Sequence, residues 1–218
     1  MSTNLSKELE LYFLGKALKE YPESRICPLS MDESIRRHKE FIEFDPIYEE
    51  LGLVPLDDAN DSNSYCYVLK TPMKGCIFHY SHDGDRLFKF STLDSWVESL
   101  NKAGKESKDI DDVDYEKRVD SKDVPGLCNY IESTYDKDSD YYSEGTVYLI
   151  QGLDERCIGL VEKLSTNGDF FIREAVAQLI SDKPNKLYRE VALKLSSDGY
   201  EQVSRPAKDA LKKINAMI

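Results

Sequence analysis

The sequence predicts an α+β domain with an antiparallel sheet and flanking helices, followed by a small all-α helical domain. Three observations lead to this fold class. Between residues 63 and 100, apolar runs separated by turn signals precede a helix start. After residue 100 the chain becomes highly charged and loses its apolar periodicity. From residue 146 the apolar residues recur at helical spacing. The predicted parts are an α+β domain, an acidic connector and a helical domain, at residues 1–102, 103–144 and 145–218.

Two helices and a short strand are expected before the sheet. Residues 5–21 place their apolar side chains on one helical face, and residues 30–44 form a second, more polar helix with His38 on its surface. Residues 51–56 predict a short edge strand. Residues 57–64 are rich in Asp but lack the central Gly and the closing Glu of a calcium loop, so we expect a solvated loop.

Three further strands are predicted to form an antiparallel meander. Residues 65–69, 75–80 and 87–90 are rich in aromatic, β-branched and other apolar residues. A turn at residues 71–74 separates the first two, and Asp83-Gly84 tolerates the positive φ angles of a tight turn before the third.

A helix should follow the meander and lie on the sheet. Ser91 and Thr92 can accept hydrogen bonds from the free N–H groups of its first turn. Its apolar residues recur at helical spacing: Leu93, Trp96, Val97 and Leu100.

This stretch resembles the SUKH superfamily, which includes fungal cell-wall assembly regulators and many bacterial immunity proteins. The residues that carry the resemblance are Asp61-Ser62-Asn63, Cys66-Tyr67-Val68, Lys74-Gly75 with His82-Asp83, and Phe90-Ser91-Thr92-Leu93 with Trp96 and Leu100. The resemblance implies a non-enzymatic immunity protein that binds a cognate toxin, commonly a nuclease or a deaminase. Such a protein blocks the toxin by covering its active site or an essential surface.

The charge of the chain favours a basic protein partner. The net charge is −12, which argues against binding nucleic acid through its phosphates. Residues 103–144 hold 13 acidic and 6 basic side chains, whereas residues 151–218 hold 10 and 11. More than half of the excess negative charge therefore lies in the connector.

We expect the connector to carry the partner-binding site. Its carboxylates would steer a basic toxin, and its tyrosines would serve as desolvated anchors, although acidic runs are also typical of solvated loops. The predicted partner-binding residues are Asp109, Asp111, Asp112, Asp114, Tyr115, Glu116, Tyr141 and Tyr142.

Four helical patterns follow, at residues 146–164, 170–180, 187–195 and 203–214. Two sequence motifs match at a 32-residue offset and resemble HEAT repeats: Ile172-Arg173-Glu174-Ala175 with Leu179, and Ser204-Arg205-Pro206-Ala207 with Leu211. An alternative function is therefore a regulatory scaffold that binds endogenous proteins through these helices.

An enzyme is the third hypothesis, and its best candidate residues are His79, His82 and Asp83. Successive side chains of a strand alternate between faces, so His79 and His82 should point to opposite sides. No phosphate-binding or metalloprotease motif is present. We therefore predict no catalytic residue, no metal site and no cofactor.

The cysteines and the N-terminus favour a cytoplasmic protein. The five cysteines are odd in number and form no C-x-x-C pair, so the sequence indicates neither a disulfide framework nor a zinc site. No signal peptide or membrane-spanning run is apparent. The sequence does not determine the oligomeric state.

Overall fold

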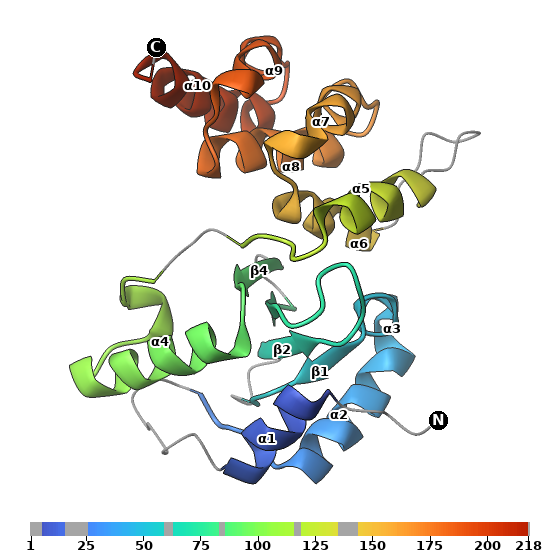
Figure 1. Ribbon diagram of the computed structural model, residues 1–218, viewed down its shortest axis with the longest axis vertical. Coiled ribbons are helices and arrows are strands. Elements are labelled where there is room, and N and C mark those ends of the chain that lie inside the picture. Colours follow the sequence, from blue (N-terminus) through green and yellow to red (C-terminus); the bar gives the residue numbers. More distant parts are fainter. Residues whose placement is uncertain are drawn as a thin grey trace. The chain divides into compact units, whose positions relative to one another are not determined.

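The computed structural model describes residues 6–15, 26–58, 63–82, 86–115, 119–134 and 144–217 (Figure 1). The chain forms two compact units, Met1–Val119 and Asp120–Ile218. Unit 1 contains a sheet with helices, and unit 2 is helical in its described residues. The α+β class is therefore confirmed.

The sheet of unit 1 has four antiparallel strands in the order β1-β2-β3-β4. The strands are β1 (Leu53–Pro55), β2 (Ser64–Val68), β3 (Ile77–Tyr80) and β4 (Leu87–Phe90). The predicted edge strand and the meander are both present. The predicted turn at Asp83-Gly84 lies outside the described residues.

One face of the sheet is covered by α1 (Lys7–Gly15) and α4 (Leu93–Glu106). Tyr12 of α1 and Trp96 of α4 pack together with a ring separation of 6.0 Å. The hydroxyl of Tyr67 on β2 donates a hydrogen bond of 2.8 Å to the Glu8 carboxylate of α1. The N-terminal helix predicted for residues 5–21 is thus present over residues 7–15, and residues 16–25 lie outside the described part.

Two further helices of unit 1 pack against strand β1. Helix α2 (Met31–Phe44) corresponds to the helix predicted for residues 30–44. It begins with a capping box between Ser30 and Glu33 and lies along β1. Helix α3 (Pro46–Leu51) was not predicted. Its signals were nevertheless present, because Asp45 caps the helix, Pro46 occupies its first turn, and Gly52 ends it with a positive φ of 64°.

The boundary of unit 1 lies beyond the predicted boundary at residue 102. Helix α4 is capped by Thr92, as its sequence suggested, but continues to Glu106. The short 3₁₀ helix η2 (Ile110–Asp112) follows, and Ile110 and Val113 are buried in the same core as Trp96. These two apolar side chains explain why the highly charged residues after 102 belong to unit 1.

Unit 2 is built from helices separated by short breaks. The helix predicted for residues 146–164 is interrupted at Leu153 and Asp154, where Asp154 caps a new 3₁₀ turn by accepting a hydrogen bond from the Arg156 N–H. The described elements are α5 (Val124–Ser133), α6 (Glu144–Leu149), η3 (Ile150–Gly152), η4 (Glu155–Cys157), α7 (Ile158–Leu164), α8 (Phe170–Asp182), η5 (Lys186–Tyr188), α9 (Arg189–Leu195) and α10 (Glu201–Asn215).

The last four α-helices recur at an offset of 31 residues rather than 32. Helices α7 and α9 begin at residues 158 and 189, and α8 and α10 begin at residues 170 and 201. The buried residues follow the same offset, since Ile172 corresponds to Val203 and Val176 to Ala207. The pattern of buried residues therefore aligns the two helix pairs at an offset of 31 residues. The sequence match at 32 residues instead aligns the buried Leu179 with the partly exposed Leu211.

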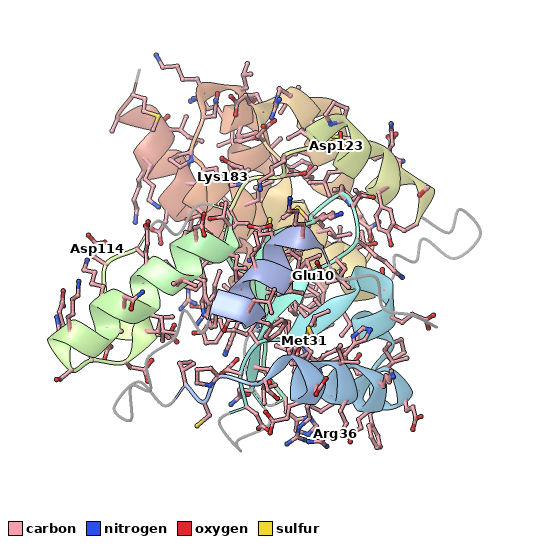
Figure 2. The ribbon with its side chains drawn as sticks, turned by 60° about the horizontal axis from the view of Figure 1, so that its bottom comes forward. Glu10, Met31, Arg36, Asp114, Asp123 and Lys183 are labelled. Atoms are coloured by element: carbon pink, nitrogen blue, oxygen red, sulfur yellow. A yellow bond between two sulfur atoms is a disulfide. The ribbon has the colours of Figure 1, made fainter. Side chains whose placement is uncertain are left out.

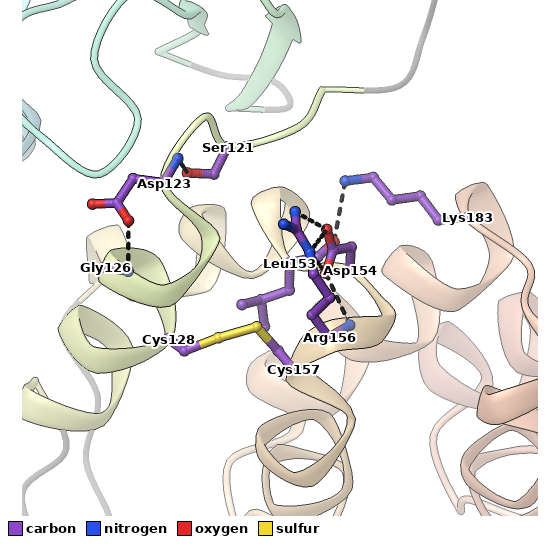
Figure 3. The surroundings of a disulfide bond; sticks show 9 residues. All are labelled: Ser121, Asp123, Gly126, Cys128, Leu153, Asp154, Arg156, Cys157 and Lys183. Carbon is purple, nitrogen blue, oxygen red and sulfur yellow. Dashed lines mark hydrogen bonds and ion pairs between the residues drawn. A yellow bond between two sulfur atoms is a disulfide. The ribbon is translucent and has the colours of Figure 1, made fainter.

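A disulfide joins Cys128 of α5 to Cys157 of η4 (Figure 3). The expectation that the sequence holds no disulfide is therefore wrong. The two cysteines are 29 residues apart in sequence, and the packing of α5 against η4 brings them together. Such a pairing leaves no local spacing signal. Of the other cysteines, Cys66 and Cys76 are buried free thiols, as expected, and Cys27 is exposed.

His38 of α2 is buried, with 8% exposure, although it was predicted to lie on the surface. Its Nδ1 donates a hydrogen bond of 2.6 Å to the carbonyl of Leu53 on β1. Burial lowers the pKa of His38 below its ordinary value of 6.5, and the hydrogen bond to Leu53 only partly opposes this effect.

Replacing both bridged cysteines should destabilise unit 2. Closing a loop of this length is worth about 3–4 kcal/mol in the unfolded-state model. We expect Cys128→Ser/Cys157→Ser to lower the free energy of unfolding by about this amount, measured by urea titration with circular dichroism. Cys27→Ser is the matched control, since that thiol is free and exposed. If the double variant and the Cys27→Ser control unfold at the same urea concentration, the prediction is contradicted.

The pKa shift of His38 predicts a pH-dependent stability. Because the folded-state pKa is lowered, the unfolded chain binds more protons as the pH falls below 6.5, so stability is lost there. Urea unfolding at several pH values should show a smaller loss for His38→Gln. A pH dependence of stability in His38→Gln equal to that of the wild type would contradict this prediction.

Candidate partner-binding site

A β-bulge places a lysine beside the acidic segment of unit 1. Ile77 pairs with Phe90 and Phe78 pairs with Phe88, so Lys89 is the extra residue of β4. The Lys89 side chain is only 9% exposed. Its Nζ lies 2.5 Å from Oδ1 of Asp111 and 3.4 Å from the hydroxyl oxygen of Tyr65. The bulge thus turns a charged side chain toward the core, where it requires a partner.

Asp111 supplies the negative charge that this lysine needs. Asp109 caps η2 by accepting a hydrogen bond of 3.1 Å from the Asp111 N–H, which fixes the start of this turn. The Tyr65 hydroxyl donates to Asp111 at 3.3 Å. Burial, followed by the nearby Asp111 charge, raises the pKa of Tyr65, so this tyrosine stays a neutral donor. Asp109 and Asp111 therefore stabilise unit 1, although both were predicted to bind a partner.

Asp112, Asp114 and Tyr115 remain available on the same segment. The side chains of Asp112 and Asp114 are exposed and form no hydrogen bond or ion pair within the described part of the chain. Tyr115 is half-buried, and its ring packs on Phe90 with a centroid separation of 4.8 Å. The other predicted residues, Glu116, Tyr141 and Tyr142, lie outside the described residues.

A surface pocket of about 390 Å³ lies between α4 and the coil after η2. Figure 2 labels Asp114 on this coil, beside α4. Two of the predicted residues, Asp114 and Tyr115, line the pocket. Residues 95, 98, 99 and 102 of α4 also line the pocket. Their spacing of three and four residues, which places them on one face of a helix, is the sequence feature from which this side of the pocket could have been predicted. The complete lining is Phe90, Ser91, Thr92, Ser95, Glu98, Ser99, Lys102, Asp114 and Tyr115.

The polar donors of this pocket are largely engaged within the protein. Within the capping box of α4, the Thr92 hydroxyl donates to Ser95 Oγ at 3.1 Å, and the Ser95 hydroxyl donates to the Thr92 carbonyl at 2.8 Å. Lys102 Nζ donates a hydrogen bond of 3.0 Å to the backbone carbonyl of Asp114. The carboxylate of Glu98, like that of Asp114, has no hydrogen-bond or ion-pair partner among the described residues. The pocket thus presents free acceptors next to an aromatic surface.

The remaining candidate sites have structural explanations. His79 lies on β3 with its ring 4.7 Å from that of Tyr65, whereas His82 lies beyond the end of the strand and is exposed. Asp57 is buried and accepts a hydrogen bond of 2.6 Å from the Tyr65 N–H, so this part of the Asp-rich segment is not a solvated loop. Searched over its described residues, the chain has no group of His, Cys, Asp or Glu side chains suited to a metal ion.

No protein-family model, curated protein or solved structure matches the chain. The resemblances to the SUKH superfamily and to HEAT repeats therefore rest on the residues quoted above. None of the helices in the described ranges has the length and apolar character needed to cross a membrane.

Removing the Asp111 carboxylate should destabilise unit 1. Asp111→Asn leaves the Lys89 ammonium without its anionic partner, which we expect to cost about 1–2 kcal/mol. Urea unfolding followed by the fluorescence of Trp96, the single tryptophan, would measure this loss.

Two further variants test the cause. Asp112→Asn removes an exposed carboxylate with no side-chain partner among the described residues, so its stability should match the wild type within experimental error. In a Lys89→Met background, Asp111→Asn should lower the free energy of unfolding much less, because no buried charge remains to be neutralised. Equal losses from Asp111→Asn with and without Lys89 would refute the charge-pair explanation.

Proposed function

We propose that this chain is a non-enzymatic immunity protein that binds a basic toxin domain and blocks it. The binding surface is the acidic edge of unit 1, which we define as Glu98, Asp112, Asp114 and Tyr115. The observation that carries the proposal is that these three carboxylates have no hydrogen-bond or ion-pair partner among the described residues, and that two of them, Glu98 and Asp114, line a pocket together with the half-buried Tyr115. The SUKH-like residues of the sheet and the net charge of −12 support the same function.

The chemistry of a nucleic-acid-cleaving toxin fits such a surface. A protein that binds nucleic acid carries clustered Lys and Arg side chains, because its substrate is a polyanion. A surface of unpaired carboxylates attracts the same cluster over a long range and then competes with the substrate for it. Tyr115 adds an amphipathic anchor of the kind that is enriched at the centre of protein interfaces. The immunity protein would in this way cover the substrate-binding surface of the toxin.

A regulatory scaffold is the second candidate, and an aromatic cluster on unit 2 favours it. The rings of Phe170 and Tyr200 stack with their centroids 4.9 Å apart. The ring centroids of Phe170 and Phe171 are 4.0 Å apart. Phe171 is 55% exposed and Tyr200 is 52% exposed. These residues lie at the N-terminal ends of α8 and α10, the helices that recur at the 31-residue offset. Stacked helix pairs of the HEAT type bind their partner proteins through an extended surface, to which exposed aromatic side chains can contribute.

Charge reversal on the acidic edge should slow association with the toxin. The partner would be isolated with the full chain as bait from cells that express the neighbouring genes, and identified by suppression of its toxicity. Asp112→Lys/Asp114→Lys should lower the association rate about tenfold at low salt and flatten its salt dependence. Asp111 is left unchanged, because its loss would destabilise the domain.

Glu132→Lys/Glu162→Lys is the matched control. These carboxylates are exposed on unit 2, and their reversal changes the net charge equally without touching the acidic edge. Equal rates for the two double variants would mean that net charge, rather than the acidic edge, controls association. Several weak partners whose capture depends on Phe171 and Tyr200, with no toxin among them, would establish the scaffold instead.

A further inference from the structure

We propose that the pocket beside α4 receives the guanidinium group of an arginine side chain from the partner. This inference rests on the proposed function and specifies which part of the partner the acidic edge recognises. The pocket is an open surface depression of about 390 Å³, which is large enough to receive one side-chain group. Its charged lining residues are Glu98, Asp114 and Lys102, so it carries one net negative charge.

The hydrogen-bonding state of the lining favours a cation over an anion. An anion would require free donors, but the Thr92 hydroxyl donates to the Ser95 hydroxyl oxygen, and the Ser95 hydroxyl donates to the Thr92 carbonyl. The Lys102 ammonium already donates to the Asp114 carbonyl. The Glu98 and Asp114 carboxylates would repel an anion, whereas they can each accept hydrogen bonds from a cation. The acidic Asp94 in the first turn of α4 also reduces the attraction of this helix end for anions.

The aromatic side of the pocket favours a guanidinium over an ammonium group. The ring of Tyr115 is half-buried on Phe90, and both residues line the pocket. A guanidinium is planar, is more weakly hydrated than an ammonium, and can stack on an aromatic ring while its edge donates to carboxylates. The pocket therefore offers an arginine side chain both an aromatic ring and carboxylate acceptors among its lining residues.

A small arginine probe tests the pocket without any toxin. N-acetyl-L-arginine amide would be titrated into the full-length ¹⁵N-labelled chain, with N-acetyl-L-citrulline amide as its uncharged isostere. We expect saturable shifts in the amide signals of Ser95, Glu98 and Lys102, with an affinity in the millimolar range. The citrulline probe should bind at least tenfold more weakly, because it lacks the charge that the carboxylates recognise.

Isosteric variants assign the interaction to individual groups. Glu98→Gln/Asp114→Asn should weaken binding of the arginine probe at least tenfold, and Tyr115→Leu should weaken it severalfold. Glu132→Gln should retain wild-type affinity, since Glu132 is an exposed carboxylate of unit 2 and does not line the pocket. The fluorescence of Trp96 would verify that each variant is folded.

The outcomes separate this inference from the proposed function. Absence of shifts at these three residues, equal binding of both probes, or equivalent shifts with inorganic phosphate would overturn the arginine pocket even if a toxin is found. Selective arginine binding in a protein that captures no toxin would leave the pocket established and would remove the immunity function. A complex with the toxin in which Glu98→Gln/Asp114→Asn binds as the wild type would also overturn the role assigned to the pocket.

Discussion

The charge pair between Lys89 and Asp111 is the constraint on which the candidate site depends. The bulge in β4 turns the Lys89 ammonium toward the core, where the Asp111 carboxylate neutralises it at 2.5 Å. This contact attaches η2 to the sheet, while Ile110 and Val113 bury their side chains beside Trp96. The coil that follows then lies along α4, and the pocket forms between the two. An acidic segment is thus ordered by one basic residue and two apolar ones.

Acidic residues that are neighbours in sequence consequently have different roles. Asp109 caps a turn and Asp111 balances a buried charge, so neither is fully available to a partner. The side chains of Asp112 and Asp114 form no hydrogen bond or ion pair with a described residue and are exposed, so a basic protein could bind them. A run of carboxylates can therefore stabilise a fold and attract a partner at the same time. The distinction depends on whether a cation lies within reach of each carboxylate.

Much of the fold follows from local physics and was predictable. The helix caps at Ser30 and Thr92, the meander and the edge strand depend on side chains within a few residues of one another. Three of the four residues of the acidic edge, Asp112, Asp114 and Tyr115, were also predicted, because they lie in a conspicuously acidic stretch of the sequence. The α4 wall with Glu98 was missed, because its residues appear as an ordinary solvated helix face until the coil after η2 packs beside it.

The α+β class, the positions of most elements and the excess of negative charge follow from the sequence alone, since periodicity, capping and composition are properties of short segments. The contacts between groups that are distant in sequence arise only when the chain folds. In the folded chain, His38 is hydrogen-bonded to Leu53, and Cys128 is disulfide-bonded to Cys157. Unit 1 extends to Val119 and not only to the predicted boundary at residue 102. Each of these outcomes depends on contacts between segments that fold onto one another, and their sequence separation carries no signal of that contact. The charge of Asp111 was visible in the sequence, but its pairing with Lys89 was a property of the folded chain.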